Sequence, residues 1–234
     1  GLEAAFMLSE HLPHIEGMNQ EAASTLIYGN EDTAPAEFTG LAAYYNDRNA
    51  DSYKNIITSG AVPDSNDNTS IWVIGWGPLS IFGIYPKGSK AGIYTHDYGK
   101  VMSENQGGTG LRGEVYRQTY DWKLGLVVKD WRYAVRIQID LEDCIASGAT
   151  GPVISDLLAQ ALRRIPNLGM CRPAIYANKE VLTVIDRQAM QKSNVLFTTV
   201  EQADGKFVTR FRGIPIRQVD AILNTETGIA ARSV

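Results

Sequence analysis

The 234-residue sequence predicts an α+β protein, and three observations carry this prediction. Helical signals come first, then a long series of strand signals, then a helix and more strands, an order that favours α+β over a wound α/β sheet. Residues 114–139 alternate between apolar and polar side chains with a period of two, which is typical of strands. The strongly apolar run 71–85 is interrupted by Gly77-Pro78, so it predicts two short strands.

The composition is that of an ordinary globular protein, with 44% hydrophobic and 21% charged residues and a formal net charge of −4. The composition does not indicate the basic surface that tight binding of nucleic acid requires. The longest apolar stretch is 15 residues and broken, whereas a membrane-spanning helix needs about 20. Cys144 and Cys171 stand in no metal-ligand spacing, which favours a reduced folding environment. No signal peptide is visible, and we expect no membrane association.

The N-terminal half is predicted to begin with helical residues 2–26, in two pieces divided near Pro13. Polar loops follow over 28–40 and 59–70. Residues 71–74 and 79–85 are predicted to form a buried hairpin or a bent pair of strands. The glycine-rich segment 86–113 has no helical stripe.

A long amphipathic strand is predicted beyond residue 113. Its apolar residues share one parity up to Val128, and those from Trp131 to Ile139 have the other, so the register flips at Lys129-Asp130 through a bulge or bend. Strands over 91–102 and 114–125, joined by a glycine-rich tip, predict an arm of roughly 35–40 Å. The arm carries aromatic residues that a lone ribbon cannot bury. It therefore either folds back on its own domain or lies on another chain.

The C-terminal half has clearer helix signals. Residues 152–165 are predicted to be helical, with Asp156 in the first turn, Arg163 and Arg164 in the last, and a stop at Pro166. A strand at 174–177 is followed by a helix capped by Asn178. Strands over 194–202 and 206–223 flank the Asp204-Gly205 turn.

Candidate chemistry is sparse. Gly108–Gly113 matches the G-x-G-x-x-G pattern of dinucleotide loops, but no buried strand precedes it and a strand, not a helix, is predicted to follow. We therefore expect a hairpin tip and no cofactor, with a nucleotide-binding enzyme as the alternative. His11 and His14 lack a third metal ligand. Both cysteines are predicted to be packed rather than nucleophilic. Asn68-Thr69-Ser70 matches a glycosylation sequon without any sign of secretion.

A series of short motifs resembles the major capsid proteins of tailed bacteriophages, in order along nearly the whole chain from residue 16. They are Tyr28-Gly29-Asn30, Phe38-Thr39-Gly40-Leu41, Tyr45-Asn46, Thr69-Ser70-Ile71-Trp72, Trp76-Gly77-Pro78, residues 83–92, Asp130-Trp131-Arg132-Tyr133, Val135-Arg136-Ile137, residues 164–169, Gly213-Ile214-Pro215-Ile216 and Asp220-Ala221-Ile222.

The resemblance implies the Hong Kong 97-like (Johnson) fold. Residues 1–83 would form the N-terminal segment and the start of the peripheral domain, and 84–128 the extended β-hairpin loop (E-loop). Residues 129–171 would complete the peripheral domain with its spine helix at 152–165, followed by the axial domain at 172–223 and a C-terminal segment at 224–234. Family members usually carry a longer N-terminal segment, so we expect this chain to be truncated or partly disordered there.

It further implies a structural protein, not an enzyme, that assembles in the bacterial cytoplasm as hexamers and pentamers into the icosahedral head shell of the virion around non-specifically held double-stranded DNA. Other partners would be the portal and a decoration or cement protein. The predicted inter-subunit contacts are Lys87, Lys90, Tyr94, Tyr98, Arg112 and Tyr116, although Lys87 and Lys90, each taken singly, are better explained as solvated lysines on a glycine-rich loop. An encapsulin-like nanocompartment shell is a further alternative with the same fold.

Overall fold

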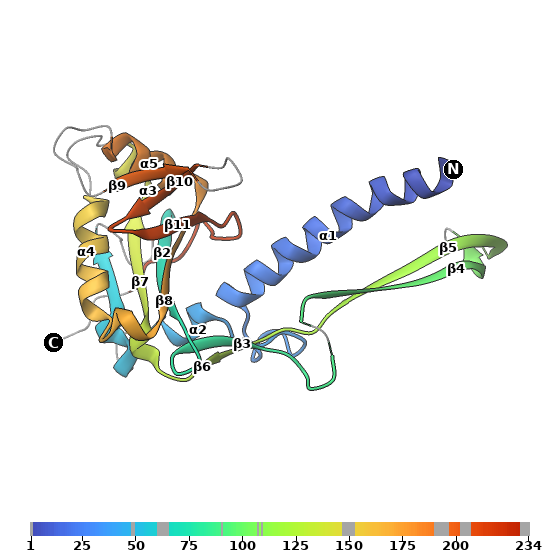
Figure 1. The fold of residues 1–234 in the computed structure, drawn as a ribbon, viewed down its shortest axis with the longest axis horizontal. Coiled ribbons are helices and arrows are strands. Elements are labelled where there is room, and N and C mark those ends of the chain that lie inside the picture. Colours follow the sequence, from blue (N-terminus) through green and yellow to red (C-terminus); the bar gives the residue numbers. More distant parts are fainter. Residues whose placement is uncertain are drawn as a thin grey trace. The chain divides into compact units, whose positions relative to one another are not determined.

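The computed structural model describes residues 2–47, 50–59, 66–89, 91–106, 108, 110–146, 153–189, 197–201 and 207–229. The chain divides into two compact units (Figure 1). The first unit comprises Gly1–Phe82 and Val128–Val234, and the second comprises Gly83–Val127. Among the described residues, no helix has the length and apolar character needed to cross a membrane.

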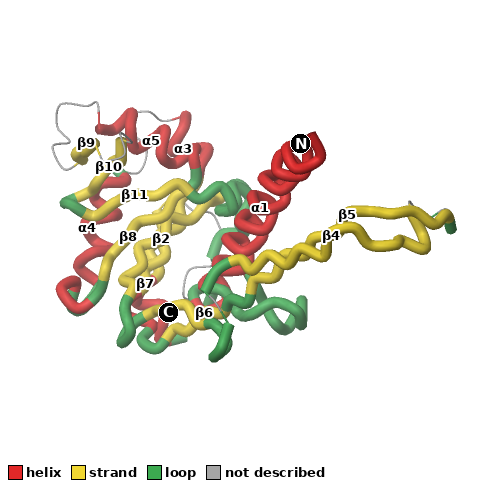
Figure 2. Tube along the Cα trace, turned by 45° about the vertical axis from the view of Figure 1, so that its right-hand side comes forward, coloured by secondary structure: helices red, strands yellow, loops and turns green. Residues whose placement is uncertain are grey.

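The larger sheet of the protein is mixed, and most of its strands lie in the first unit. Its main path has the order β1-β7-β2-β8-β11-β10-β9, and β3 pairs with both β2 and β6. The strands are β1 (Ile56–Ser59), β2 (Asn68–Trp76), β3 (Ile81–Ile84), β6 (Gly125–Val128), β7 (Ala134–Asp140), β8 (Arg172–Ala177), β9 (Phe197–Glu201), β10 (Phe207–Phe211) and β11 (Ile214–Gln218). The β1–β7 and β8–β11 pairs are parallel, and β2 is antiparallel to β7 and β8. Figure 2 shows β11, β8, β2 and β7 side by side. A mixed sheet together with separate helices confirms the predicted α+β class.

Three helices cover one face of this sheet: α3 (Leu141–Ala146), α4 (Ile154–Arg164) and α5 (Lys179–Ala189). The core residues alternate along the strands, as the period of two predicts. Ile71 and Val73 of β2 pack with every second residue of β7 and with the apolar stripes of α4 and α5. Figure 1 shows α4 lying along the sheet. The predicted spacing of α4 is confirmed, with Asp156 in its first turn and Arg163 and Arg164 in its last.

The residues of opposite parity in β2 and β7, among them Ser70 and Arg136, point to the other face of the sheet, where they take part in a buried polar cluster. The Glu226 carboxylate accepts hydrogen bonds from Arg136 Nη2 (2.9 Å), the Ser70 hydroxyl and the Tyr28 hydroxyl. Arg136 also donates to the Tyr45 carbonyl (2.9 Å), and its guanidinium lies 5.3 Å from the centre of the Trp72 ring. Arg136 and Glu226 are 5% or less exposed at their side chains. We call these residues the Glu226 cluster.

The cluster joins both ends of the chain to the sheet. Tyr28 is the last residue of α1 (Leu2–Tyr28), and α2 (Leu41–Tyr44) ends next to Tyr45. Burial, and then the charge of Glu226, hold the pKa of the Tyr28 hydroxyl well above its usual range. Gln138, two residues along β7 from Arg136, fixes the C-terminal segment by donating to the Thr227 carbonyl (2.9 Å) and accepting from the Ile229 amide (2.8 Å).

Several predicted boundaries are wrong, two of them in the N-terminal part of the chain. The N-terminal helix is continuous through Pro13, because the strong helix formers on both sides outweigh the one hydrogen bond that proline removes. The polar stretch 59–70 does not end at residue 70: β2 begins at Asn68, and its first three residues are fully buried, which also rules out glycosylation of folded Asn68.

The long strand predicted beyond residue 113 is two strands, since β5 (Leu111–Trp122) ends before β6 begins. The flip at Lys129-Asp130 is made by a bend, the 3-10 turn Trp131–Tyr133, and the backbone amide of Arg132 donates to the Asp130 carboxylate (3.0 Å). Arg132 donates to that carboxylate and holds the pKa of Asp130 below its usual value. Of the two arrangements predicted for 71–85, the bent pair is confirmed, since Trp76 and Ile81 pair in parallel.

A tight turn at Arg212-Gly213 divides the segment predicted as 206–223. Both residues have positive φ, +50° and +83°, between the paired residues Phe211 and Ile214. Two left-handed residues match the twist of a two-residue hairpin.

We expect Gly213→Ala to lower the free energy of unfolding by about 1–2 kcal/mol, because a Cβ is strained at this φ. Arg212→Asn, at the neighbouring position, should change stability by less than about 0.5 kcal/mol, since asparagine tolerates the left-handed region. Urea unfolding of the purified protein measures both variants. Equal losses for the two variants would refute this explanation.

Candidate assembly interface

The second unit contains an antiparallel hairpin of β4 (Ile93–Gln106) and β5 (Leu111–Trp122). The predicted ribbon is therefore present. β4 is longer than the predicted strand 91–102, and β5 begins and ends three residues before the predicted strand 114–125. Gly108 and Gly110 at the tip have φ of +75° and +73°, the conformations that glycine was predicted to supply. The G-x-G-x-x-G pattern lies across this tip and runs into a strand, so it lacks the helix N-terminus that a pyrophosphate site needs.

The register of the hairpin sorts its side chains onto two faces. Tyr94 lies opposite Asp121 and His96 opposite Thr119, whereas Lys100 lies opposite Tyr116. Positions 116 and 121 differ by an odd number within β5, so they point to opposite faces. The register shifts between Asp97 and Gly99, where Tyr98 is the extra residue. Tyr94 and Tyr116, which the sequence grouped together, therefore cannot both touch one flat surface.

One face carries a row of three rings, Tyr94, His96 and Tyr98, which we call the tyrosine row. The His96 ring stacks on Tyr94 with centroids 6.4 Å apart and meets Tyr98 edge-on at 4.3 Å. Tyr94 is 49% and Tyr98 is 51% exposed. The rings cover one another in part, and much of their apolar surface remains open to solvent.

The opposite face, which we call the Lys100 face, carries Lys100, Met102, Tyr116 and Gln118, and the same register places Ile93, Tyr120 and Trp122 there. The Lys100 ammonium lies 5.2 Å from the centre of the Tyr116 ring, a cation–π arrangement, and the Tyr120 hydroxyl donates to Gln118 (3.1 Å). Tyr116 is 43% and Met102 is 63% exposed. Polar and charged groups thus already engage the rings of this face.

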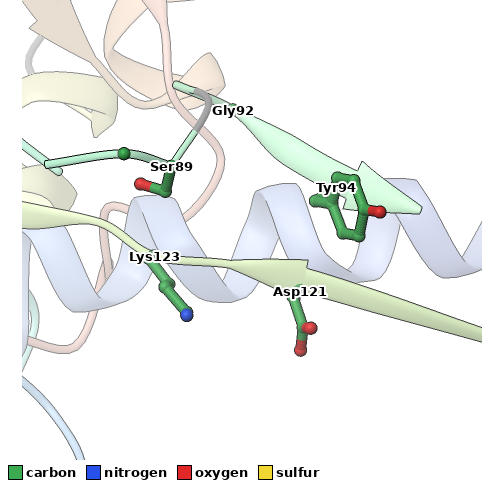
Figure 3. Close-up of a pocket in the computed structure, with 6 residues that line it drawn as sticks. Ser89, Gly92, Tyr94, Asp121 and Lys123 are labelled. Carbon is green, nitrogen blue, oxygen red and sulfur yellow. The ribbon is translucent and has the colours of Figure 1, made fainter. Parts of the chain in front are cut away.

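A hollow of about 380 Å³ opens at the root of the hairpin (Figure 3). Its lining residues are Gly88, Ser89, Gly92, Tyr94, Asp121 and Lys123. In Figure 3 the side chains of Asp121 and Lys123 point the same way at the end of β5. The register pairs Asp121 with Tyr94, so these two side chains share one face of the hairpin. The hollow and the tyrosine row therefore share Tyr94 and form one continuous surface.

The remaining predicted contact residues are Lys87, Lys90 and Arg112. Lys87 is exposed in a turn closed by the Ser89 amide donating to the Pro86 carbonyl (3.1 Å). Arg112 is exposed beside the tip. Lys90 lies outside the described residues. Lys87, next to the hollow-lining Gly88, and Arg112, beside the tip, thus lie toward opposite ends of the hairpin.

No catalytic arrangement emerges from the part of the chain that the structure describes. There, no three His, Cys, Asp or Glu side chains gather as metal ligands. Cys144 is buried, and desolvation followed by the charge of Asp140 raises the pKa of its thiol to about 11. Burial also raises the pKa of Cys171. Both thiols stay protonated at neutral pH, as expected for packed rather than nucleophilic cysteines.

Comparison with known proteins identifies the family to which the chain belongs. A family model described as the major capsid protein GP7 matches residues 1–230. The chain belongs to this family. A search of solved structures finds a chain in the near-atomic-resolution cryo-EM structure of bacteriophage Epsilon15, with 31% sequence identity and a TM-score of 0.66, covering 97% of this chain and 68% of that one. No curated protein matches.

As a member of the GP7 family, the protein is a phage major capsid protein that forms the head shell of the virion and assembles with copies of itself. It is a structural protein and not an enzyme. These findings overturn the nucleotide-binding alternative for Gly108–Gly113 and decide against a nanocompartment shell. The Glu226 cluster gathers residues from several of the motifs that carry the resemblance. They are Tyr28, Tyr45, Ser70, Trp72 and Arg136.

Proposed function

We propose that this capsid protein assembles as hexamers and pentamers into an icosahedral shell around double-stranded DNA, and that residues 84–128 are an extended loop lying on a neighbouring copy. In this proposal α4 is the spine helix of a peripheral domain, completed by residues 129–171, and residues 172–223 form the axial domain. A portal and a decoration protein remain proposed partners.

The observation that carries the proposal is the exposure of the hairpin's aromatic rings. A two-stranded ribbon has no interior, so its apolar side chains gain burial only against another surface. The buried core cluster of the protein contains no residue between 83 and 127 among those described. A neighbouring copy is the partner that a capsid lattice supplies to every hairpin.

In this proposal the exposed charges of Lys87 and Arg112 contact a neighbouring copy, and such contacts are weak one at a time and strong in sum. Exposed ion pairs contribute about 0–1 kcal/mol each. Repetition in a closed lattice makes such contacts add, because every subunit is held by several neighbours at once. The net charge of −4 also suits a container that must not adhere tightly to DNA.

Charge reversal at the tip tests the proposal. Arg112→Glu should leave the melting temperature of the soluble subunit unchanged, because Arg112 is exposed. It should raise the protein concentration needed for particle formation about ten-fold, equivalent to about 1.4 kcal/mol. Sedimentation and negative-stain microscopy measure assembly.

The matched control is Arg112→Lys, which keeps the positive charge and should assemble near the wild-type concentration. Normal assembly of Arg112→Glu would show that the tip touches no neighbour. A fall in subunit solubility shared by both variants would point to folding instead, and would count against the proposed contact as well.

A further inference from the structure

The two faces of the hairpin are chemically unequal, and this inequality bears on how copies meet. On the Lys100 face, the Lys100 ammonium covers the Tyr116 ring and Gln118 accepts from Tyr120. On the other face, Tyr94, His96 and Tyr98 contact one another through their rings. Covering either face strips water from charged groups, since Arg117 and Asp121 lie on the face of the tyrosine row and Lys100 on the other. The faces differ because the Lys100 ammonium already lies against the Tyr116 ring, whereas Tyr94 and Tyr98 are about half exposed, so covering them removes apolar ring surface from water.

We propose that the hairpin docks on a second copy of this chain through the face formed by Tyr94, His96, Tyr98 and the root hollow, and that the Lys100 face stays in solvent. The inference rests on the proposed function, in which the hairpin lies on a neighbour. It adds which face makes the contact.

The hollow at the root favours the same face of the hairpin. It opens on the same side as the tyrosine row and shares Tyr94 with it, so one partner surface covers both. Asp121 offers acceptors and Lys123 offers donors at its wall. The hollow thus accepts one protruding polar side chain, which sets the position of the docked copy along the ribbon.

The size of the face indicates a lattice neighbour rather than a separate partner protein. Fourteen residues of β4 span about 46 Å and two paired strands about 10 Å, so one face offers roughly 460 Å². A stable pairwise interface buries about 800 Å² on each partner. This face alone makes a weak contact, which suffices only where a closed lattice repeats it.

Paired substitutions on the two faces test the inference in the full-length chain. Tyr94→Ser with Tyr98→Ser changes the tyrosine row, and Met102→Ser with Tyr116→Ser is the matched control, two exposed apolar residues on the opposite face. We expect the first pair to raise the concentration for particle formation at least ten-fold and the second to change it less than about three-fold. A larger effect of the second pair would overturn the face assignment while leaving hairpin docking intact.

If neither pair changes assembly, the hairpin contacts no neighbour and the proposed function of this segment fails. Hydroxyl-radical footprinting of the wild-type protein gives a second readout that needs no variant. On assembly, Tyr94 and Tyr98 should lose at least half of their reactivity, and Tyr116 should keep most of its own. Protection of Tyr116 with continued reactivity of Tyr94 and Tyr98 would reverse the assignment.

Discussion

Glu226→Gln is expected to lower the free energy of unfolding of the subunit by about 3–5 kcal/mol, because it leaves the buried Arg136 guanidinium without its counter-charge. The loss is large because the carboxylate also accepts from Ser70 and Tyr28. An amide in its place cannot accept all of these hydrogen bonds, and an unpaired buried donor costs about 1–3 kcal/mol. Urea unfolding followed by circular dichroism measures the loss.

The matched control is Glu37→Gln, the same chemical change at an exposed carboxylate, which should shift stability by less than about 0.5 kcal/mol. A double-mutant cycle with Arg136→Met should show strong coupling, since removing both charges leaves neither one unpaired. Additive losses would mean that the two side chains act independently. A Glu226→Gln subunit as stable as the control would refute the role of the cluster in holding the C-terminal segment.

The parts of the fold that follow local periodicity were predictable from the sequence. The parity of Val135, Ile137 and Ile139 predicted that they share one face of a strand, and the stripe around Leu158 predicted the face of α4 that the structure buries in the same core. The break of β10 from β11 was missed because Arg212-Gly213 lacks the Asn-Gly or Asp-Gly signature of such turns, although Arg212 adopts the same left-handed conformation. The interruption at Pro13 was overestimated because a local rule competes with the propensities on both sides of it.

The Glu226 cluster was not predicted, because its charged pair lies 90 residues apart in the chain. A signal was present, however. Arg136 stands between the apolar residues Val135 and Ile137, and Ser70 directly precedes the apolar run that begins at Ile71. A fully buried strand exposes neither face to water. Polar residues of one parity in such a strand require a polar partner, but the sequence does not reveal which carboxylate supplies it.

The candidate interface was predicted in outline and not in its division into faces. Alternation within each strand is local, whereas the register between β4 and β5 depends on the irregularities between Asp97 and Gly99 and between Ser103 and Gln106. A single extra residue moves every later side chain to the other face. For this reason, the sequence grouped Tyr116 with Tyr94 and Tyr98, and only the structure separates them.

Replacing Tyr94–Asp121 by an Asn-Gly turn is expected to abolish shell formation while the subunit still folds. Ile93 and Trp122 are paired neighbours across the two strands, so a two-residue turn closes them without strain. The first unit keeps its whole core cluster, which has no described member in the removed segment. Its melting temperature should therefore change by only a few degrees, about 1 kcal/mol or less.

Assembly should fail at ten times the wild-type threshold, because the change removes the same contact from every subunit and the losses multiply around a closed lattice. Sedimentation reports particles, and calorimetry on the same sample reports folding. Closed shells from the shortened chain would mean that the hairpin is dispensable for assembly and that the lattice is held by the sheet-bearing unit. A shortened chain that does not fold would instead show that the hairpin supports the first unit, contrary to the independence on which the proposed loop depends.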